Sequence, residues 1–445
     1  MWGANVSFPF FISFHVAVTQ TVVVDINHLS VGMFVHLDVG WLHHPFRSNR
    51  FRIASQSQIQ LLQSMGLKSV RCVAAANSEQ ILRSLPLGAE LPKDSDATPQ
   101  EPEQNTAFVQ KEGDLQLAKE RLVLSRCDQN FSHATEQFLQ VIQQISGNLN
   151  QARASSESVV SDCVAQLLEY EEPAIHLLSE NVGERNAHHP VNVMVLCLLL
   201  GKIQGMGAEE LRQLGLAALL HDVGKLCLPV RLANRLEGQT SRKKAMFESH
   251  VGESVALAEQ MGLASEVVTA IAQHHEMADG SGFPLHLLGE DMGAAGKVIA
   301  LVNCYDGLCN PSVSMDALTP HEALAQLFVQ KKTNFDSVAL ADFIRMMGVY
   351  PPGSIVQLSD ERYALVVSVS AFRPLRPRVL VYDPKVPRND AVALPLEEFP
   401  LIGIRCSLKP SQLPRSAFQY LSPRKRISYF FERSMDPRAV REDGR

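Results

Sequence analysis

Apolar residues recur at three- and four-residue steps through the middle of the chain, which is the period of an α-helix. Three such runs lie at residues 211–221, 266–274 and 292–308. The first two runs end on His221 and His274, so each histidine lies at the end of an apolar face that is directed into a core. The pattern predicts a compact helical bundle over residues 182–349, with ligand side chains that project inward.

Alternating apolar and polar positions predict strands at both ends of the chain. Near the N-terminus, the expected elements are strands at residues 22–26, 31–35 and 70–73 and a short helix at residues 59–65. They form a small α+β domain at residues 21–76. After the bundle, strands are expected at residues 355–358, 363–369 and 378–382, within a β-rich extension at residues 350–420.

The segments between and after these units differ in composition. Residues 84–113 collect Pro, Glu, Asp, Gln and Gly, which predicts a mobile, solvated linker at residues 77–113. Residues 114–181 contain no proline before Pro173, and their helical period predicts a connector made of a long helix or a helical hairpin. The connector could transmit a signal, support a homodimer or only pack on the bundle. Residues 421–445 are rich in arginine and predict a disordered basic tail, with phosphate or partner binding as the alternative.

Composition narrows the class of protein. A chain of 445 residues with 46% hydrophobic and 20% charged residues has room for roughly two to four domains. The net charge of −6 gives no indication of binding to a nucleic acid polymer. The eight cysteines have no framework spacing, which favours reduced thiols. The apolar residues 8–18 are too short to span a bilayer, so we expect a cytoplasmic protein without a transmembrane segment.

The strongest chemical signal is the sequence HHEMADGSGFP at residues 274–284, which follows HDVGK at residues 221–225. A lone His-Asp pair is usually a surface or capping pair. His274 and His275 are adjacent, however, and on a helix they would point about 100° apart, so one buried face does not explain both. Imidazole and carboxylate ligands suit Fe, Mn, Zn or Ni, and two such ions can polarise a phosphodiester and generate hydroxide. The motifs predict a polynuclear metal site for phosphodiester hydrolysis.

These motifs resemble the HD-GYP family of phosphohydrolases, whose known activity is hydrolysis of the bacterial messenger cyclic di-GMP. The resemblance runs from about His189 to Pro352. It implies metal ligands at His189, His221, Asp222, His250, His274 and His275. It also implies that Asp222 bridges two ions, with His189 and His221 on one side and the other three histidines on the opposite side. His188 is then a bystander, and Lys225 faces the phosphate or, alternatively, only caps its helix.

Two departures from the family pattern concern the metal ligands. The family usually ends its ligand set with an aspartate, and this chain has Asn303 at that position. A neutral amide oxygen can bind a metal but holds it less tightly, which could impair activity. Asp306 could substitute only after a shift along the helix. Some members carry a glutamate where this chain has Arg185, so we expect two metals rather than three.

Two further departures concern the substrate. Gly282, Phe283 and Pro284 occupy the place of the Gly-Tyr-Pro tripeptide, so the ring is kept and the hydroxyl is lost. We expect these three residues and Lys225 to contact the substrate. Residues 309–313 lack the cation that the family often places there. The N-terminal unit resembles a small domain of unknown function that often precedes HD-GYP modules, and we expect it to be regulatory.

The sequence therefore predicts a mainly α protein. It combines an HD-type helical bundle with a small α+β N-terminal domain and a short β-rich C-terminal extension. The expected activity is hydrolysis of cyclic di-GMP with two divalent ions such as Fe or Mn, with Asp222 and Lys225 as catalytic residues. The alternative is a degenerate module that binds cyclic di-GMP or a diguanylate cyclase partner without efficient turnover. A third hypothesis is a metal-dependent phosphatase that acts on another nucleotide.

Overall fold

The computed structural model describes residues 103–229, 240–311, 317–370, 373–399 and 401–434, together with short segments between residues 21 and 73. The chain divides into two compact units, Met1–Glu101 and Pro102–Arg445. The predicted metal ligands all lie in the second unit. Among the described residues, no helix is both long and apolar enough to cross a membrane.

The first unit contains a small antiparallel sheet. Its strands are β1 (Thr21–Asp25), β2 (Phe34–His36), β3 (Arg50–Arg52) and β4 (Ser69–Val73), in the order β1-β4-β2-β3. Met33, Val35 and Ile53 are fully buried beneath it. The strands predicted at residues 22–26 and 70–73 are confirmed, and Ile59 and Leu62 of the predicted helix are helical. Residues 8–18 lie outside the described residues.

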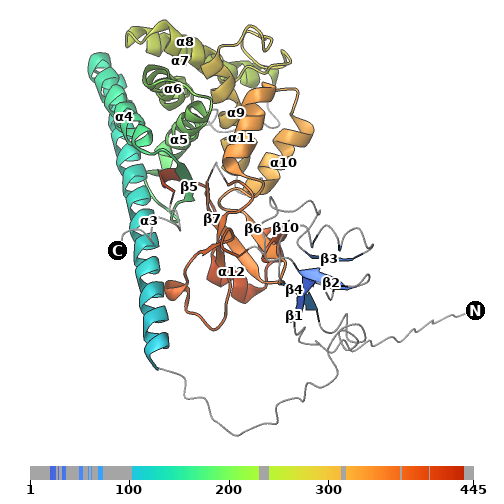
Figure 1. The fold of residues 1–445 in the computed structure, drawn as a ribbon. Helices are drawn as coiled ribbons and strands as arrows, with labels where there is room; N and C mark the ends of the chain where they lie inside the picture. Colours follow the sequence, from blue (N-terminus) through green and yellow to red (C-terminus); the bar gives the residue numbers. More distant parts are fainter. Residues whose placement is uncertain are drawn as a thin grey trace, which may run out of the picture. The chain divides into compact units, whose positions relative to one another are not determined.

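The second unit is mainly helical, as predicted (Figure 1). Its long helices are α3 (Glu103–Ile145), α4 (Leu149–Glu169), α5 (His188–Ile203), α6 (Ala208–Leu220), α7 (Ser241–Gln260), α8 (Ser265–Ala272), α9 (Ala294–Cys309), α10 (Pro320–Gln330) and α11 (Ser337–Met347). Asn148 caps α4, because its side chain accepts a hydrogen bond from the Gln151 backbone at 3.1 Å. Gly215 lets α6 approach α4 closely, since a Cβ there would lie 2.6 Å from Val160. The second contact places α6, the helix that ends at His221, against α4.

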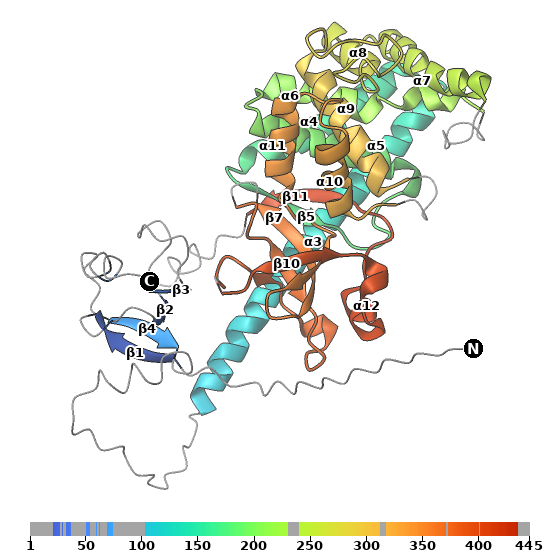
Figure 2. The ribbon, with the colours of Figure 1, turned by 90° about the vertical axis from the view of Figure 1, so that its right-hand side faces the viewer.

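An antiparallel sheet lies beside the bundle in the same unit (Figure 2). Its strands are β5 (Pro173–Leu177), β6 (Ile355–Leu358), β7 (Tyr363–Ser370), β8 (Arg378–Val381), β9 (Leu394–Pro395), β10 (Ile404–Leu408) and β11 (Tyr429–Arg433). The main path is β10-β6-β7-β5-β11, and β8 pairs with β7 and β9. A short helix, α12 (Arg415–Leu421), precedes β11. The three strands predicted after the bundle are β6, β7 and β8.

Three predictions about the connecting segments need correction. Helix α3 begins at Glu103, inside the predicted linker, because the charged and polar residues after position 102 favour a helix as well as a linker. Strand β5 lies inside the segment predicted to be helical and joins the distant β7.

The third correction concerns the basic tail. Residues 421–434 are ordered, and β11 pairs with β5 from Tyr429↔Leu177 to Arg433↔Pro173. Tyr429, Phe430 and Phe431 are buried, and this apolar run outweighs the basic residues around it. One of the charges also has a partner, because the Arg424 guanidinium donates to the Leu178 carbonyl at 3.0 Å. Residues 435–445, with the last three arginines, lie outside the described residues.

Candidate metal centre

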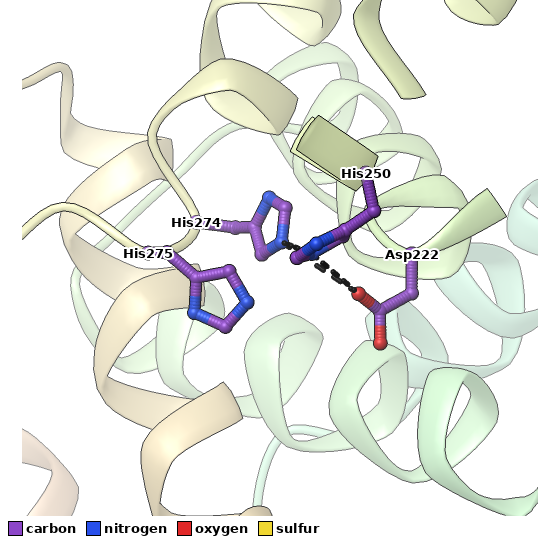
Figure 3. Close-up of side chains that lie close together, drawn as sticks. All are labelled: Asp222, His250, His274 and His275. Atoms are coloured by element: carbon purple, nitrogen blue, oxygen red, sulfur yellow. Dashed lines mark hydrogen bonds and ion pairs between the residues drawn. The ribbon is translucent and has the colours of Figure 1, made fainter. Parts of the chain in front are cut away.

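The predicted histidine and aspartate ligands come together inside the bundle. They form two groups that share Asp222, and within each group the ligand atoms lie within 4.8 Å of one another. The first group is Asp222, His250, His274 and His275, and the second is His189, His221 and Asp222. Figure 3 shows His250 and His274 turned toward Asp222, with His275 beside them. The division agrees with the one that the family resemblance implied.

Local backbone bonds fix the orientation of three imidazole rings. The Nδ1 atoms of His221, His250 and His274 bond to the carbonyl three residues earlier, at 2.7, 2.5 and 2.6 Å. A carbonyl oxygen only accepts hydrogen bonds, so each Nδ1 carries the proton and each Nε2 keeps its lone pair. This second contact is the usual way in which a protein orients a histidine that binds metal.

The Nε2 atoms converge in pairs on the two oxygens of Asp222. His189 Nε2 and His221 Nε2 are 3.2 Å apart, and each lies 3.4 Å from Asp222 Oδ2. His250 Nε2 and His274 Nε2 are also 3.2 Å apart, and they lie 3.3 and 3.7 Å from Oδ1. Lone pairs of His250 and His274 that face each other repel, and a cation between them and the carboxylate removes the repulsion.

Two buried polar atoms of the cluster have no hydrogen-bond partner among the described residues. They are Asp222 Oδ1 and His275 Nε2. An unpaired buried acceptor or donor costs free energy unless something else satisfies it. Together with the converging lone pairs, these atoms show that the residues present fit a divalent metal.

The electrostatics of the cluster favour the ligand forms that bind metals. Burial raises the pKa of Asp222, but Lys225 and the surrounding histidines outweigh it and hold this pKa well below its usual range. The Lys225 ammonium lies 2.5 Å from Asp222 Oδ2. Burial lowers the pKa of His274 to about 4, and it also lowers the pKa of His221 and His275. At neutral pH the carboxylate is therefore ionised and these imidazoles are neutral.

His189 differs from the other three rings, because its Nδ1 bonds to the Asp306 carboxylate rather than to a backbone carbonyl. Burial lowers the pKa of His189, but hydrogen bonds to Asp222 and Asp306 outweigh it and raise the pKa to about 9. His189 Nδ1 donates to Asp306 Oδ2 at 2.6 Å, while Asn192 and Asn310 donate to the other oxygen at 2.5 and 2.9 Å. Asp306 was considered above only as a substitute ligand. In the structure it positions His189 instead.

The glycine of the HDVGK motif brings the aspartate against helix α7. The short 3-10 helix η4 (Val223–Cys227) follows Asp222, and Gly224 N donates to Ser254 Oγ at 2.8 Å. A Cβ on Gly224 would lie 2.1 Å from the His250 carbonyl oxygen, so a larger residue cannot fit there. Ser254 is buried, and sequence reasoning missed its role.

The paired histidines lie beyond the end of α8 rather than inside it. The helix ends at Ala272, and the rings of His274 and His275 are 4.3 Å apart at 45°. The prediction that a regular helix separates them by about 100° is therefore wrong. The turn lets both rings face the same cluster, which a straight helix would prevent.

The tripeptide Gly282-Phe283-Pro284 packs against this turn. Phe283 N donates to the His275 carbonyl at 3.1 Å, and the two rings stack at 4.5 Å and 23°. Glu276 is buried and accepts hydrogen bonds from the backbone of Leu285 and Leu287, at 2.6 and 2.9 Å. Sequence reasoning missed Glu276, although its place after two ligands was a signal. The substrate contacts of Gly282, Phe283 and Pro284 remain predictions.

Asn303 lies beside the cluster, whereas His188 faces away from it. Asn303 is buried, and its Nδ2 donates to the His274 carbonyl at 3.4 Å, so it lies next to the ligand turn. Its binding to a metal remains a prediction. His188 faces away from the cluster, because its ring contacts Ser428 Oγ at 3.1 Å and packs edge-on against Phe131. His189 is the member of this pair that joins the cluster.

Comparisons with known proteins support this description. Residues 162–338 match the model of the HD domain, and residues 21–162 match a domain of unknown function, DUF3391. A cyclic di-GMP phosphodiesterase of Pseudomonas aeruginosa, PA4108, is 25% identical over 364 residues, which cover 81% of this chain and 84% of that protein.

Two shorter matches involve related activities. The cyclic di-GMP phosphodiesterase PdeB of Borreliella burgdorferi is 23% identical over 43% of this chain and 50% of that protein. The 3′3′-cGAMP-specific phosphodiesterase 2 of Vibrio cholerae is 28% identical over 33% of this chain and 29% of that protein. The chain thus carries an HD domain preceded by a DUF3391 domain, and it is similar to proteins named as cyclic di-GMP phosphodiesterases.

Proposed function

We propose that this protein hydrolyses cyclic di-GMP at a centre that holds two divalent metal ions. The observation that carries the proposal is the pair of ligand groups that share Asp222. One carboxylate oxygen faces His189 and His221, and the other faces His250 and His274. An aspartate that offers each oxygen to a separate set of imidazoles suits a bridge between two ions.

The remaining residues have distinct proposed roles. His275 completes the second group, and Asn303 adds a neutral ligand beside it. Two ions there would supply Lewis acidity to a phosphodiester and activate water for its hydrolysis. Lys225 is half-buried beside Asp222, where its charge would stabilise the phosphate or the leaving oxygen. Phe283 stacks on His275 and would present a ring to a nucleobase or ribose.

The test measures metal content and turnover in the same full-length sample. The protein is purified without oxygen, its bound metals are quantified by elemental analysis, and cyclic di-GMP loss is followed with added Mn or Fe(II). The variants are His221→Ala and Asp222→Ala, with His133→Ala as a matched control, because His133 is exposed on α3. We expect two metals per chain, and turnover that both cluster variants abolish and the control keeps.

A substrate panel separates this proposal from its alternatives. The panel holds cyclic di-GMP, 3′3′-cGAMP and cyclic di-AMP at equal concentration. Faster hydrolysis of a different member would replace the proposed substrate. Binding of cyclic di-GMP without turnover at full metal content would contradict the proposed activity and support a receptor instead. The neutral Asn303 is the feature that would explain that outcome.

A further inference from the structure

A second site with unassigned chemistry lies in the sheet of the larger unit. It is a cavity of about 40 Å³, lined by residues of β5, β7, β8 and β9 and of the segments after β7, β9 and β11, among them His176, Ser368, Arg373, Arg376, Arg378 and Glu397. None of these residues belongs to the His/Asp cluster. Ser368 and His176 are buried on this sheet face beside three arginines, and buried polar side chains require a partner.

The register of the sheet builds the polar face. His176 of β5 lies opposite Ser368 of β7, and Ser368 lies opposite Arg378 of β8, so the three form one row across neighbouring strands. Because side chains alternate along a strand, Ile175 and Leu177 point to the other face and join the hydrophobic core. Ser368 is only 3% exposed and His176 is 9% exposed. Backbone pairing between the strands therefore fixes the relative positions of these three residues.

His176 lines the cavity with an unsatisfied atom. Its Nε2 is buried and has no hydrogen-bond partner among the described residues. Burial and the neighbouring Arg378 lower the pKa of His176 to about 4, so the ring is neutral at pH 7. A neutral imidazole can donate one N–H, and an acceptor in the cavity would satisfy it. The arginine nearby makes a cationic ligand unfavourable there.

The charges around the cavity are mainly positive. Arg373 pairs with Glu397, and Arg378 pairs with Glu120 of α3. Arg376 bonds to the carbonyls of Leu396 and Ile402 at 3.3 and 3.4 Å, and it has no carboxylate partner in the described part of the chain. Among the described residues, three guanidinium groups therefore meet two carboxylates around the cavity, which leaves the local charge positive.

We propose that this cavity binds a phosphate group, either inorganic phosphate or the terminal phosphate of a nucleotide. Guanidinium groups offer several N–H donors in a fixed plane, and they recognise oxyanions of this kind. Serine hydroxyls and the His176 N–H add donors from a separate direction. A volume of about 40 Å³ holds roughly three water-sized atoms, which suits three oxygens of one phosphate with the fourth at the mouth, and it is too small for a nucleobase.

The first experiment measures binding of inorganic phosphate to the full-length protein by calorimetry, in buffer of constant ionic strength. The test variants are Arg376→Gln, which removes the arginine without a carboxylate partner, and Ser368→Ala, which removes a buried hydroxyl and leaves the packing in place. The matched control is Arg405→Gln, because Arg405 is exposed on β10 and lies outside the cavity. We expect Arg376→Gln to weaken phosphate binding by about tenfold or more, Ser368→Ala to weaken it less, and the control to bind like the parent.

The His/Asp cluster could itself bind phosphate, so one further variant separates the two sites. His221→Ala disrupts the cluster and should keep phosphate binding in the sheet. Binding that persists in Arg376→Gln and disappears in His221→Ala would place the anion at the metal centre and overturn the proposal. Absence of saturable binding to the parent protein at millimolar phosphate would overturn it as well.

The source of the phosphate is identified with GMP and guanosine under the same conditions. Tighter binding of GMP than of phosphate, with no binding of guanosine, would indicate a nucleotide whose phosphate enters the cavity. Equal or weaker binding of GMP would indicate inorganic phosphate. Both results require the loss in Arg376→Gln. Thermal unfolding of each variant checks that the sheet is intact, since Arg376 bonds to two loop carbonyls.

Discussion

Asp306→Asn is the sharpest test of how the chain holds a metal ligand. The Asp306 carboxylate is buried and only accepts hydrogen bonds: one from His189, and one each from Asn192 and Asn310. An asparagine at this position has one accepting oxygen and one donating NH₂ group. It therefore cannot replace the carboxylate in either orientation.

The two orientations fail for different reasons. If the new amide oxygen faces Asn192 and Asn310, its NH₂ group faces His189 Nδ1 and forces the proton onto Nε2, the atom that faces Asp222. If the oxygen faces His189 instead, the NH₂ group meets the donors of the two asparagines. The first case removes the metal-facing lone pair, and the second leaves buried donors unsatisfied.

The expected magnitude follows from this geometry. Loss of a carboxylate behind a ligating histidine lowers metal affinity by about 10- to 100-fold, or about 1.4–2.7 kcal/mol. We expect the loss only at the group that contains His189 and His221, because Asp306 bonds to no member of the other group. Unfolding should become easier by about 1.5–3 kcal/mol, since the lost bonds are to a charged group.

The assay is a metal titration against a competing chelator at constant pH, which resolves two classes of site. Asp342→Asn is the matched control, because Asp342 pairs only with Arg345 on α11 at 2.8 Å in the described contacts. Equal weakening of both classes, or unchanged affinity in both, would refute the reasoning. Thermal unfolding of the metal-free variant separates a local loss of affinity from a loss of fold.

Three further predictions address other parts of the site. Asn303→Asp would add a carboxylate beside His274, so metal affinity and turnover should rise by several-fold; no gain in a chelator titration or in the rate would rule out Asn303 as a weak ligand. Gly224→Ala places a Cβ 2.1 Å from a backbone oxygen, so thermal unfolding should show a loss of 2 kcal/mol or more, on the order of an overpacked core. Burial lowers the pKa of His176 to about 4, below the unfolded value near 6.5, so its stabilising effect is present above pH 6.5 and is lost as the pH falls toward 4. His176→Gln should therefore lose about 1.6 kcal/mol less than the parent between pH 6.5 and pH 5 in urea unfolding, and identical pH profiles of the two proteins would refute the role of His176.

The metal centre could largely be predicted because its signals are local. His221 and Asp222 end one apolar helix, and His274 follows another, so periodicity alone places them at the core. The geometry of the paired histidines could not be predicted, because it depends on where α8 stops. That end is set by the turn in which Glu276 fastens the following loop, and a buried carboxylate bonded to backbone leaves no periodic trace.

The sheet could be predicted only in part, for a different reason. Hairpin strands such as β6 and β7 follow each other closely and show alternation. Strands β5 and β11 are separated by the whole bundle, and each is short. Their pairing depends on contacts between distant segments, which composition and local pattern do not record. Basic residues around Tyr429 then made an ordered strand resemble a solvated tail.

This misread strand has a direct connection to the metal centre. Asn192 accepts from the Tyr429 backbone at 2.8 Å, and Asn310 accepts from the Ile427 backbone at 2.8 Å. The same two asparagines donate to Asp306, which holds His189. The two asparagines that bind the C-terminal segment through their oxygens therefore also bind Asp306 through their NH₂ groups, so a change in the segment should disturb the orientation of His189. For this reason the described part of the C-terminal segment supports the His/Asp cluster, although none of its described residues is a member of that cluster.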